Sequence, residues 1–303
     1  MADLSVNLAG IKMKNPVMSA SGTFGSGSEY ASLFDISKMG ALVTKGLTLR
    51  PRAGNKPPRI CETPAGLLNA VGLQNPGVEA FISDVLPEML GFGVPVIANI
   101  AGSTTDEFVE MARQLSGTGI VGLEINISCP NVKTGGMALG TVPEVAAQVV
   151  EAVVKETDLP VIVKLTPNVT NIVELARAVA GAGADALSLI NTLVGMVIDV
   201  EQRKPVLGNV VGGLSGPAIR PVGVWAVWQV AQAVDIPIVG MGGICTGQDA
   251  LEFILAGASA VAVGSAFFNN PMAAVRIITE LDEYCTKHGV DKLQDLVGAA
   301  WKE

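Results

Sequence analysis

The chain has 303 residues, of which 49% are apolar and 16% are charged. A chain of this composition can bury a large core, which excludes an intrinsically disordered protein. Its 20 basic and 28 acidic residues give a net charge of −8, which argues against nucleic acid and anionic membranes as partners. The single histidine, His288, excludes a Ser-His-Asp triad and a multi-histidine metal site, and we expect it at a solvated helix end.

The cysteines and the N-terminal residues indicate in which cellular compartment the protein lies. The four cysteines lie far apart in the sequence, at Cys61, Cys129, Cys245 and Cys285. Because no C-x-x-C pair occurs, we expect no zinc or iron–sulfur site held by this chain alone and no bound metal. Residues 1–4 lack the basic and apolar features of a signal peptide, and glycines and a proline interrupt the longest uncharged stretch, 253–275. We therefore expect a cytoplasmic protein with reduced thiols and no membrane span.

Short apolar runs recur along the chain and end at a polar residue or a glycine. Eight runs are strand candidates: residues 16–20, 41–45, 95–99, 121–126, 160–164, 186–191, 237–241 and 260–264. Helical stretches are expected between them, at residues 78–90, 105–115, 142–156, 172–182, 222–234, 247–256 and 272–288. This alternation predicts an α/β fold, a (β/α)8 TIM barrel formed by residues 1–303 as a single domain. A doubly wound open sheet is the alternative, which is disfavoured because no G-x-G-x-x-G follows the first strand.

Two connections, residues 46–94 and 192–236, are too long for simple turns. Their front halves, residues 49–77 and 193–220, are rich in Gly, Pro and Asn. In a barrel these long loops after strands 2 and 6 would rise over the face that carries the active site. Residues 4–6 and 11–13 are expected to form a short hairpin that plugs the opposite end.

The carboxyl ends of the eight strands bring polar side chains to one mouth of the predicted barrel. These ends hold two lysines, three asparagines, one cysteine and several glycines, without a pair of carboxylates. Such a set suits a ligand with amide edges and negative charge, and it lacks the acid pair of a glycosidase.

Two glycine turns, Gly242-Gly243 and Gly264-Ser265, end the last two strands. Their backbone N–H groups could hold a phosphate with help from a helix N-terminus, or the glycines only make tight turns.

Lys45 and Lys164 each end an apolar run, and three functions are open for them. Each could hold a phosphate or a flavin oxygen, form a Schiff base, or extend its ammonium group to solvent. Cys129, just past strand four, is either a small buried hydrophobic residue or a working thiol.

Several runs resemble class 1 dihydroorotate dehydrogenases. They are Asn126-Ile-Ser-Cys-Pro-Asn131, Thr44-Lys-Gly46, Asn69-Ala-Val-Gly-Leu-Gln-Asn-Pro-Gly77, Asn191-Thr192, Gly213-Leu-Ser-Gly216 and Gly242-Gly-Ile244. The resemblance covers essentially the whole chain, and the cysteine loop combined with the Asn69–Gly77 loop is its most specific part. Class 2 enzymes carry serine at the position of Cys129 and a membrane-binding N-terminal helix. The continuation Val132–Gly136 is most like the NAD-linked class 1B catalytic subunit.

The resemblance implies an FMN-binding barrel that oxidises (S)-dihydroorotate to orotate in pyrimidine (UMP) biosynthesis. It implies Cys129 as the base that removes a ring proton while hydride passes to FMN, and Lys45 as a second catalytic residue. The implied substrate-binding residues are Lys45, Asn69, Ala70, Val71, Gly72, Leu73, Asn126, Asn191 and Thr192. The implied FMN-binding residues are Ser21, Lys45, Gly46, Asn99, Asn126, Lys164, Ile190, Gly216, Gly242, Gly243, Gly264 and Ser265.

The class 1B resemblance also implies a route for the electrons. A partner iron–sulfur flavoprotein subunit, with FAD and a 2Fe-2S cluster, would pass them to NAD+ in a heterotetramer built around a catalytic dimer. The alternatives are a fumarate-dependent class 1A homodimer, a Schiff-base lyase or isomerase on the same barrel, and a non-catalytic scaffold.

Overall fold

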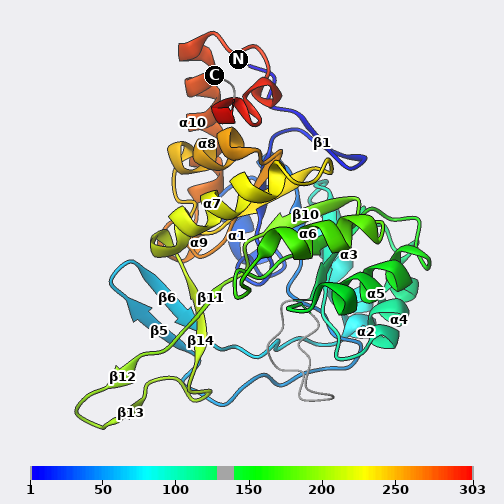
Figure 1. Ribbon diagram of the computed structural model, residues 1–303, viewed down its shortest axis with the longest axis vertical. Coiled ribbons are helices and arrows are strands. Elements are labelled where there is room, and N and C mark those ends of the chain that lie inside the picture. Colours follow the sequence, from blue (N-terminus) through cyan, green and yellow to red (C-terminus); the bar gives the residue numbers. More distant parts are fainter. Residues whose placement is uncertain (1, 128–139, 302–303) are drawn as a thin grey trace.

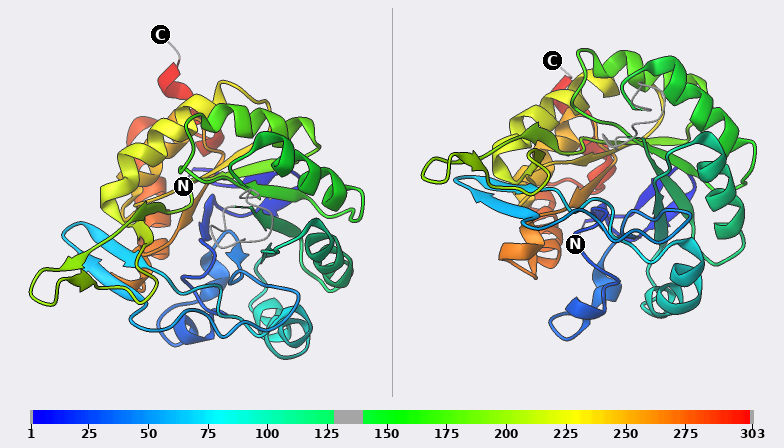
Figure 2. Two further views of the ribbon diagram at one scale, coloured as in Figure 1. Left: turned by 60° about the horizontal axis from the view of Figure 1, so that its bottom comes forward. Right: turned by 90° about the horizontal axis from the view of Figure 1, so that it is seen from below.

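The computed structural model describes residues 2–127 and 140–301, and its central feature is a barrel. Eight parallel strands form one sheet, and its two outer members, β3 and β4, meet through a bridge between Met18 and Ala41. In sheet order the strands are β3 (Val17–Ser19), β16 (Ala260–Val263), β15 (Ile238–Met241), β10 (Ala186–Leu189), β9 (Val161–Lys164), β8 (Gly122–Asn126), β7 (Val96–Ile100) and β4 (Leu42–Val43). Helices surround the strands (Figure 1, Figure 2). The prediction of a TIM barrel is therefore confirmed, and the open doubly wound sheet is wrong.

The longer helices of the described chain cover the outside of the barrel. They are α4 (Thr105–Leu115), α5 (Pro143–Val154), α6 (Ile172–Gly181), α7 (Arg220–Ala231), α8 (Gly247–Ala256) and α10 (Ala273–His288). The bounds of α4 and α8 agree with the sequence prediction because both helices begin at a capping threonine. Thr104 accepts a hydrogen bond from the N–H of Glu107, and Thr246 forms a capping box with Asp249.

The helix expected at residues 78–90 has three parts. Its ends are α-helical, at α2 (Val78–Ala80) and α3 (Leu86–Gly91), and a π-helical turn, η2 (Phe81–Val85), joins them. Pro87 has no N–H to donate to the carbonyl of Ser83, so a regular α-helical ladder cannot pass this point. Only two short helical turns, α1 (Ser28–Ala31) and η1 (Ile36–Lys38), lie between β3 and β4, and a third, α9 (Ala266–Asn269), follows β16.

A hairpin closes the amino-terminal end of the barrel, as predicted, although its first strand begins two residues later than the expected residues 4–6. Strands β1 (Val6–Leu8) and β2 (Ile11–Met13) pair antiparallel, and every second side chain is buried. Their apolar side chains join the inner core of the barrel, which includes Met18, Ile97 and Val239. The hairpin therefore acts as an apolar plug.

The two long connections meet in a second sheet, which the sequence analysis did not reveal. Its strands, in order, are β11 (Leu193–Gly195), β14 (Gly212–Ser215), β6 (Gly66–Asn69) and β5 (Ile60–Thr63). Between β11 and β14 the chain forms a projecting hairpin of β12 (Ile198–Asp199) and β13 (Lys204–Pro205) (Figure 1). The pairing that joins the two halves of the second sheet, Asn69 of β6 with Gly213 of β14, spans 144 positions of sequence, so local pattern carries little signal for it.

Candidate active site

A buried carboxylate, Glu124, organises the mouth of the barrel. Glu124 lies on β8, and its side chain is 3% exposed. The hydroxyl of Ser188 donates to Glu124 Oε1 at 2.7 Å, and Asn99 Nδ2 donates to Glu124 Oε2 at 2.5 Å. Lys164 Nζ lies 3.7 Å from the same Oε2. The sequence analysis named Asn99 and Lys164 but missed Glu124, although a glutamate within the apolar run Gly122–Ile125 is a signal that could have found it.

The four residues of this cluster come from four neighbouring strands, β7 to β10. The strand register sets Asn99 opposite Glu124 and Ser188 opposite Lys164. Glu124 itself is opposite Ile162 and Lys164 is opposite Asn126, so the cluster spans two levels of the barrel and the side chains of Glu124 and Lys164 meet between them. We refer to Asn99, Glu124, Lys164 and Ser188 as the Glu124 cluster.

One oxygen of this cluster has no partner. Asn99 Oδ1 and Arg220 Nε are the only buried side-chain polar atoms of the described chain without a hydrogen bond. Arg220 Nε lies 3.3 Å from the carboxylate of Glu252, so its charge is compensated. Asn99 Oδ1 therefore stands alone as an unsatisfied buried acceptor, and such groups call for a ligand.

Lys164 connects the cluster to the first strand of the barrel. Its ammonium group donates to the hydroxyl of Ser21 at 3.0 Å, and the residue is 4% exposed. Two FMN-site candidates from distant parts of the sequence, Ser21 and Lys164, are thus in direct contact. Asn126 lies opposite Lys164 in the strand register, which adds a third candidate to this group.

Lys45 lies beside the same mouth, at the exit of β4. Its side chain passes Gly22, where an added Cβ would lie 3.4 Å from Lys45 Nζ. Burial, and secondly the positive charge of Arg59, lower the pKa of Lys45 from its ordinary value. A desolvated cation of this kind is ready to pair with an anionic ligand.

The loop that contains Ala70, Val71, Gly72 and Leu73 is fixed against the barrel by Asn75. Asn75 Nδ2 donates to the carbonyl of Leu73 at 2.7 Å, and Asn75 Oδ1 accepts from the N–H of Thr48 at 3.1 Å. An added Cβ on Gly46 would lie 3.0 Å from both Leu73 Cδ2 and Asn99 Oδ1. The position of Gly46 is therefore crowded, and glycine lets the loop approach the Glu124 cluster closely here.

The remaining substrate candidates meet at Gly213 of β14. Asn69 pairs with Gly213 across the second sheet, and an added Cβ on Gly213 would collide with the side chain of Thr192. Asn191 Oδ1 accepts from the N–H of Thr192 at 2.8 Å. Asn168, which the sequence analysis did not name, donates to the carbonyl of Thr192 at 2.9 Å and anchors this segment.

The glycines of the expected phosphate site lie in two places. Gly216 and Gly243 are in contact, because an added Cβ on Gly243 would lie 2.6 Å from the carbonyl oxygen of Gly216. Both adopt positive φ angles, of 101° and 75°. Gly242 neighbours Ile190, whereas Gly264, which precedes Ser265, faces Ala20 and Thr23 at the end of β3. The positive φ angles favour glycine here, and the contact between Gly216 and Gly243 joins the end of β14 to the end of β15.

The expected base, Cys129, lies outside the described residues, as does the continuation of its loop. Of the other cysteines, Cys285 is buried in α10, and Cys61 and Cys245 are half-buried. Burial raises the pKa of the Cys245 thiol despite the nearby Arg220 and Arg276, so it stays protonated at neutral pH. His288 is exposed at the end of α10, as predicted.

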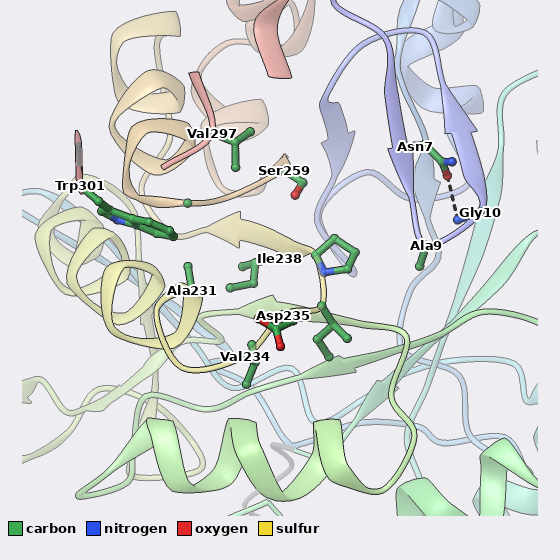
Figure 3. Close-up of a pocket in the computed structure, with 13 residues that line it drawn as sticks. Asn7, Ala9, Gly10, Ala231, Val234, Asp235, Ile238, Ser259, Val297 and Trp301 are labelled. Carbon is green, nitrogen blue, oxygen red and sulfur yellow. Dashed lines mark hydrogen bonds between the residues drawn. The ribbon is translucent and has the colours of Figure 1, made fainter. Parts of the chain in front are cut away.

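A cavity of about 570 Å³ lies away from the mouth, at the end of the barrel closed by the plug (Figure 3). Asn7, Ala9 and Gly10 line one side of it, and Asp235 and Trp301 line the other. Asp235 is its one charged lining residue, and no candidate from the sequence analysis reaches it. TIM-barrel enzymes have their active sites at the carboxyl ends of the strands, so we assign the candidate active site to the mouth of the barrel.

No helix in residues 2–127 and 140–301 combines the length and apolar character required to cross a membrane.

Comparison with known proteins agrees with this architecture. The dihydroorotate dehydrogenase family model matches residues 3–285. A protein of Desulforudis audaxviator (strain MP104C) is 62% identical over 297 residues, covering 98% of this chain and 97% of its own. A protein of Geobacter sp. (strain M21) is 57% identical over 298 residues, covering 98% of this chain and 98% of its own. A protein of Geobacillus sp. (strain WCH70) is 52% identical over 304 residues, covering 100% of this chain and 97% of its own. All three are named dihydroorotate dehydrogenase B (NAD(+)), catalytic subunit. This chain therefore belongs to the dihydroorotate dehydrogenase family.

Proposed function

We propose that this chain is the catalytic subunit of an NAD-linked dihydroorotate dehydrogenase and that it binds FMN at the barrel mouth. It would oxidise (S)-dihydroorotate to orotate in pyrimidine biosynthesis, as a single cytoplasmic domain. The relatives' shared name supports the reaction. The observation that carries the proposal is the Glu124 cluster, in which a buried cation and an unpaired acceptor lie together at the carboxyl ends of the strands.

The residues at the mouth fit FMN. The unsatisfied Asn99 Oδ1 needs a donor, and the imide N–H of an isoalloxazine ring is such a donor. The buried Lys164 supplies positive charge where the reduced ring is anionic. Gly46 would offer backbone to the ring, and the glycines at the ends of β15 and β16 would offer backbone N–H groups to the phosphate. FMN supplies the hydride acceptor when bound.

The substrate candidates would read the amide edges and carboxylate of dihydroorotate. Asn69, Asn126, Asn191 and Thr192 offer neutral donors and acceptors, which bind such edges without burying further charge. Lys45 would pair with the substrate carboxylate, since its ammonium group is partly desolvated. The backbone of residues 70–73, which Asn75 fixes, would complete this site.

Cys129 would remove the ring proton. A thiol has an ordinary pKa of about 8.5, so a modest environmental effect gives enough thiolate to accept a proton near neutral pH. The expected position after β8 would put Cys129 near Asn126, and the class 2 serine would be a weaker base.

Electrons would leave through a partner subunit that carries FAD and a 2Fe-2S cluster. The relatives are named as catalytic subunits, which supports a second subunit of a different kind. Two catalytic chains would form the centre of a heterotetramer. A catalytic chain that reduces NAD+ at full rate after purification without a partner would contradict this assignment.

The projecting hairpin supports a catalytic dimer. Exposed apolar side chains gather on it and on the adjoining strands: Ile60, Val194, Met196, Ile198, Val200, Val210 and Val211. Val200 is 76% exposed, so its burial against a second copy would remove apolar surface from water. Replacing Ile198 and Val200 by aspartate should give a monomeric catalytic chain in sedimentation, whereas a dimer that persists would place the interface elsewhere.

The direct test is a visible spectrum of the purified protein before and after anaerobic addition of dihydroorotate. We expect a flavin absorption band that bleaches on addition. A colourless protein that borohydride traps covalently with its substrate would instead identify a Schiff-base lysine. Stimulation of turnover by fumarate would favour the homodimeric class, and stimulation by NAD+ only with the partner subunit supports the proposal.

A further inference from the structure

We propose that Glu124 is a positioning residue that sets which way Asn99 faces and how much positive charge Lys164 presents to the bound cofactor. The proposal rests on the proposed function, because the cofactor is the FMN assigned to the mouth. It assigns a function to a residue that touches three other side chains and need not touch the cofactor itself.

The orientation of Asn99 follows from the chemistry of a carboxylate. An ionised carboxylate accepts hydrogen bonds and donates none, so the Asn99 amide must turn its NH2 group towards Glu124. Its oxygen is thereby directed away from Glu124 and is the unpaired atom beside Gly46. The backbone N–H of Asn99 donates to Thr44 Oγ1 at 2.9 Å, which fixes the residue at a second point. A neutral Gln at position 124 could satisfy either orientation of the amide.

The carboxylate itself is fixed by two neighbours. Ser188, which is fully buried, donates to Oε1, and Asn99 donates to Oε2. Each oxygen thus has its own donor, and the carboxylate cannot rotate without losing both bonds. Lys164 lies on the Oε2 side, so Glu124 supplies a negative charge at 3.7 Å from its ammonium group. In a site this buried the pair is poorly screened by solvent.

These contacts make Glu124 a control on FMN affinity and potential. Within the Glu124 cluster, the acceptor Asn99 Oδ1 and the cation of Lys164 match a ligand edge that carries both an N–H and an electron-rich nitrogen or oxygen. Removing the charge of Glu124 would release Asn99 to flip and present its NH2 group, which weakens binding of that edge. It would also remove the negative charge that lies 3.7 Å from the Lys164 ammonium group, which favours the reduced, anionic FMN over the oxidised form.

The test is Glu124→Gln, measured by fluorescence titration of the apoprotein with FMN and by spectroelectrochemical titration of the holoprotein. We expect FMN affinity to fall about tenfold or more, because the released Asn99 amide can flip and lose the hydrogen bond that its oxygen would accept from FMN. We expect the affinity ratio of reduced to oxidised FMN to rise about tenfold, which is a shift of the two-electron potential to a more positive value by about 30 mV. Glu151→Gln on the exposed face of α5 is the matched control and should change neither quantity.

Glu124→Asp separates charge from position and decides the question if the Gln variant does not fold. Aspartate keeps the charge, but its shorter side chain cannot hold Asn99 and Ser188 together. FMN affinity should therefore fall while the potential stays closer to wild type. Folded Glu124 variants with wild-type affinity and potential would overturn the inference and leave the proposed function intact. A wild-type protein that binds no FMN would overturn the proposed function instead.

Discussion

The two ends of the barrel are closed in opposite ways. At the amino-terminal end the β1–β2 plug places four apolar side chains against the inner core, and none of the four is more than 4% exposed. At the carboxyl end the mouth buries a carboxylate, an ammonium group and an amide oxygen that has no partner. Burial of apolar groups stabilises a fold, whereas burial of charged and unpaired polar groups costs free energy.

The two ends of the barrel therefore have different functions: the plug stabilises the fold, and the mouth holds the residues expected to bind ligands. The plug lowers the free energy of the folded chain and needs no ligand. The mouth keeps a buried acceptor, Asn99 Oδ1, that no described residue satisfies, as is common at sites that exchange stability for activity. Variants at the mouth should therefore change ligand binding and turnover, and variants in the plug should change unfolding alone.

The largest expected effect is on turnover, from Cys129→Ala at the mouth. Loss of a general base should lower kcat by about 10²–10⁴-fold while FMN stays bound. Stopped-flow reduction of the flavin by dihydroorotate measures it, and Cys61→Ala on β5 controls for the loss of a thiol. Cys129→Ser should retain some activity with a pH optimum shifted upward, because a hydroxyl ionises at higher pH than a thiol. Turnover within threefold of wild type in the alanine variant would refute Cys129 as the base.

A substitution in the plug should have the opposite signature. Leu8→Ala empties a fully buried position, so the free energy of unfolding should fall by about 2–4 kcal/mol. Urea unfolding measures this loss, and kcat should remain at the wild-type value. Lys12→Ala on the exposed face of the same hairpin is the control and should change neither. A Leu8 variant that loses turnover without losing stability would break the division between the two ends.

Much of the barrel could be predicted from the sequence because its signals are local. All eight barrel strands were expected, since each is a short apolar run between turn residues, and the capped helices α4 and α8 were expected to the residue. The plug was recognisable from two short runs around Ala9-Gly10. The second sheet was not, because its pairing depends on contacts between the two long connections.

The site was predicted less completely, for a related reason. The family resemblance implied Ser21, Lys164 and Asn99 as FMN-binding residues, and the structure brings Lys164 and Asn99 to Glu124 and Ser21 to Lys164. Glu124 itself lies within a strand, where a sequence pattern treats a charged residue as an interruption. Asn75 lies in the Asn69–Gly77 motif, but its function as a loop anchor, like that of Asn168, depends on backbone contacts that the sequence does not show.

The smallest effect on stability is expected at Lys45. Whether a substitution there raises or lowers the Tm tests directly whether the mouth, unlike the plug, costs stability. Because the pKa of Lys45 lies below its ordinary value of 10.5, the unfolded chain binds this proton more tightly than the folded chain. The charge therefore costs stability at neutral pH, and the cost disappears as pH rises through the lowered pKa towards 10.5.

Lys45→Met should raise the Tm of the apoprotein by about 1–3 °C at pH 7 and by less near pH 10, while substrate affinity is lost. Calorimetry at the two pH values measures this, with exposed Lys14→Met as the control. A Lys45→Met variant that is less stable at pH 7 would mean that this part of the mouth stabilises the fold, as the plug does.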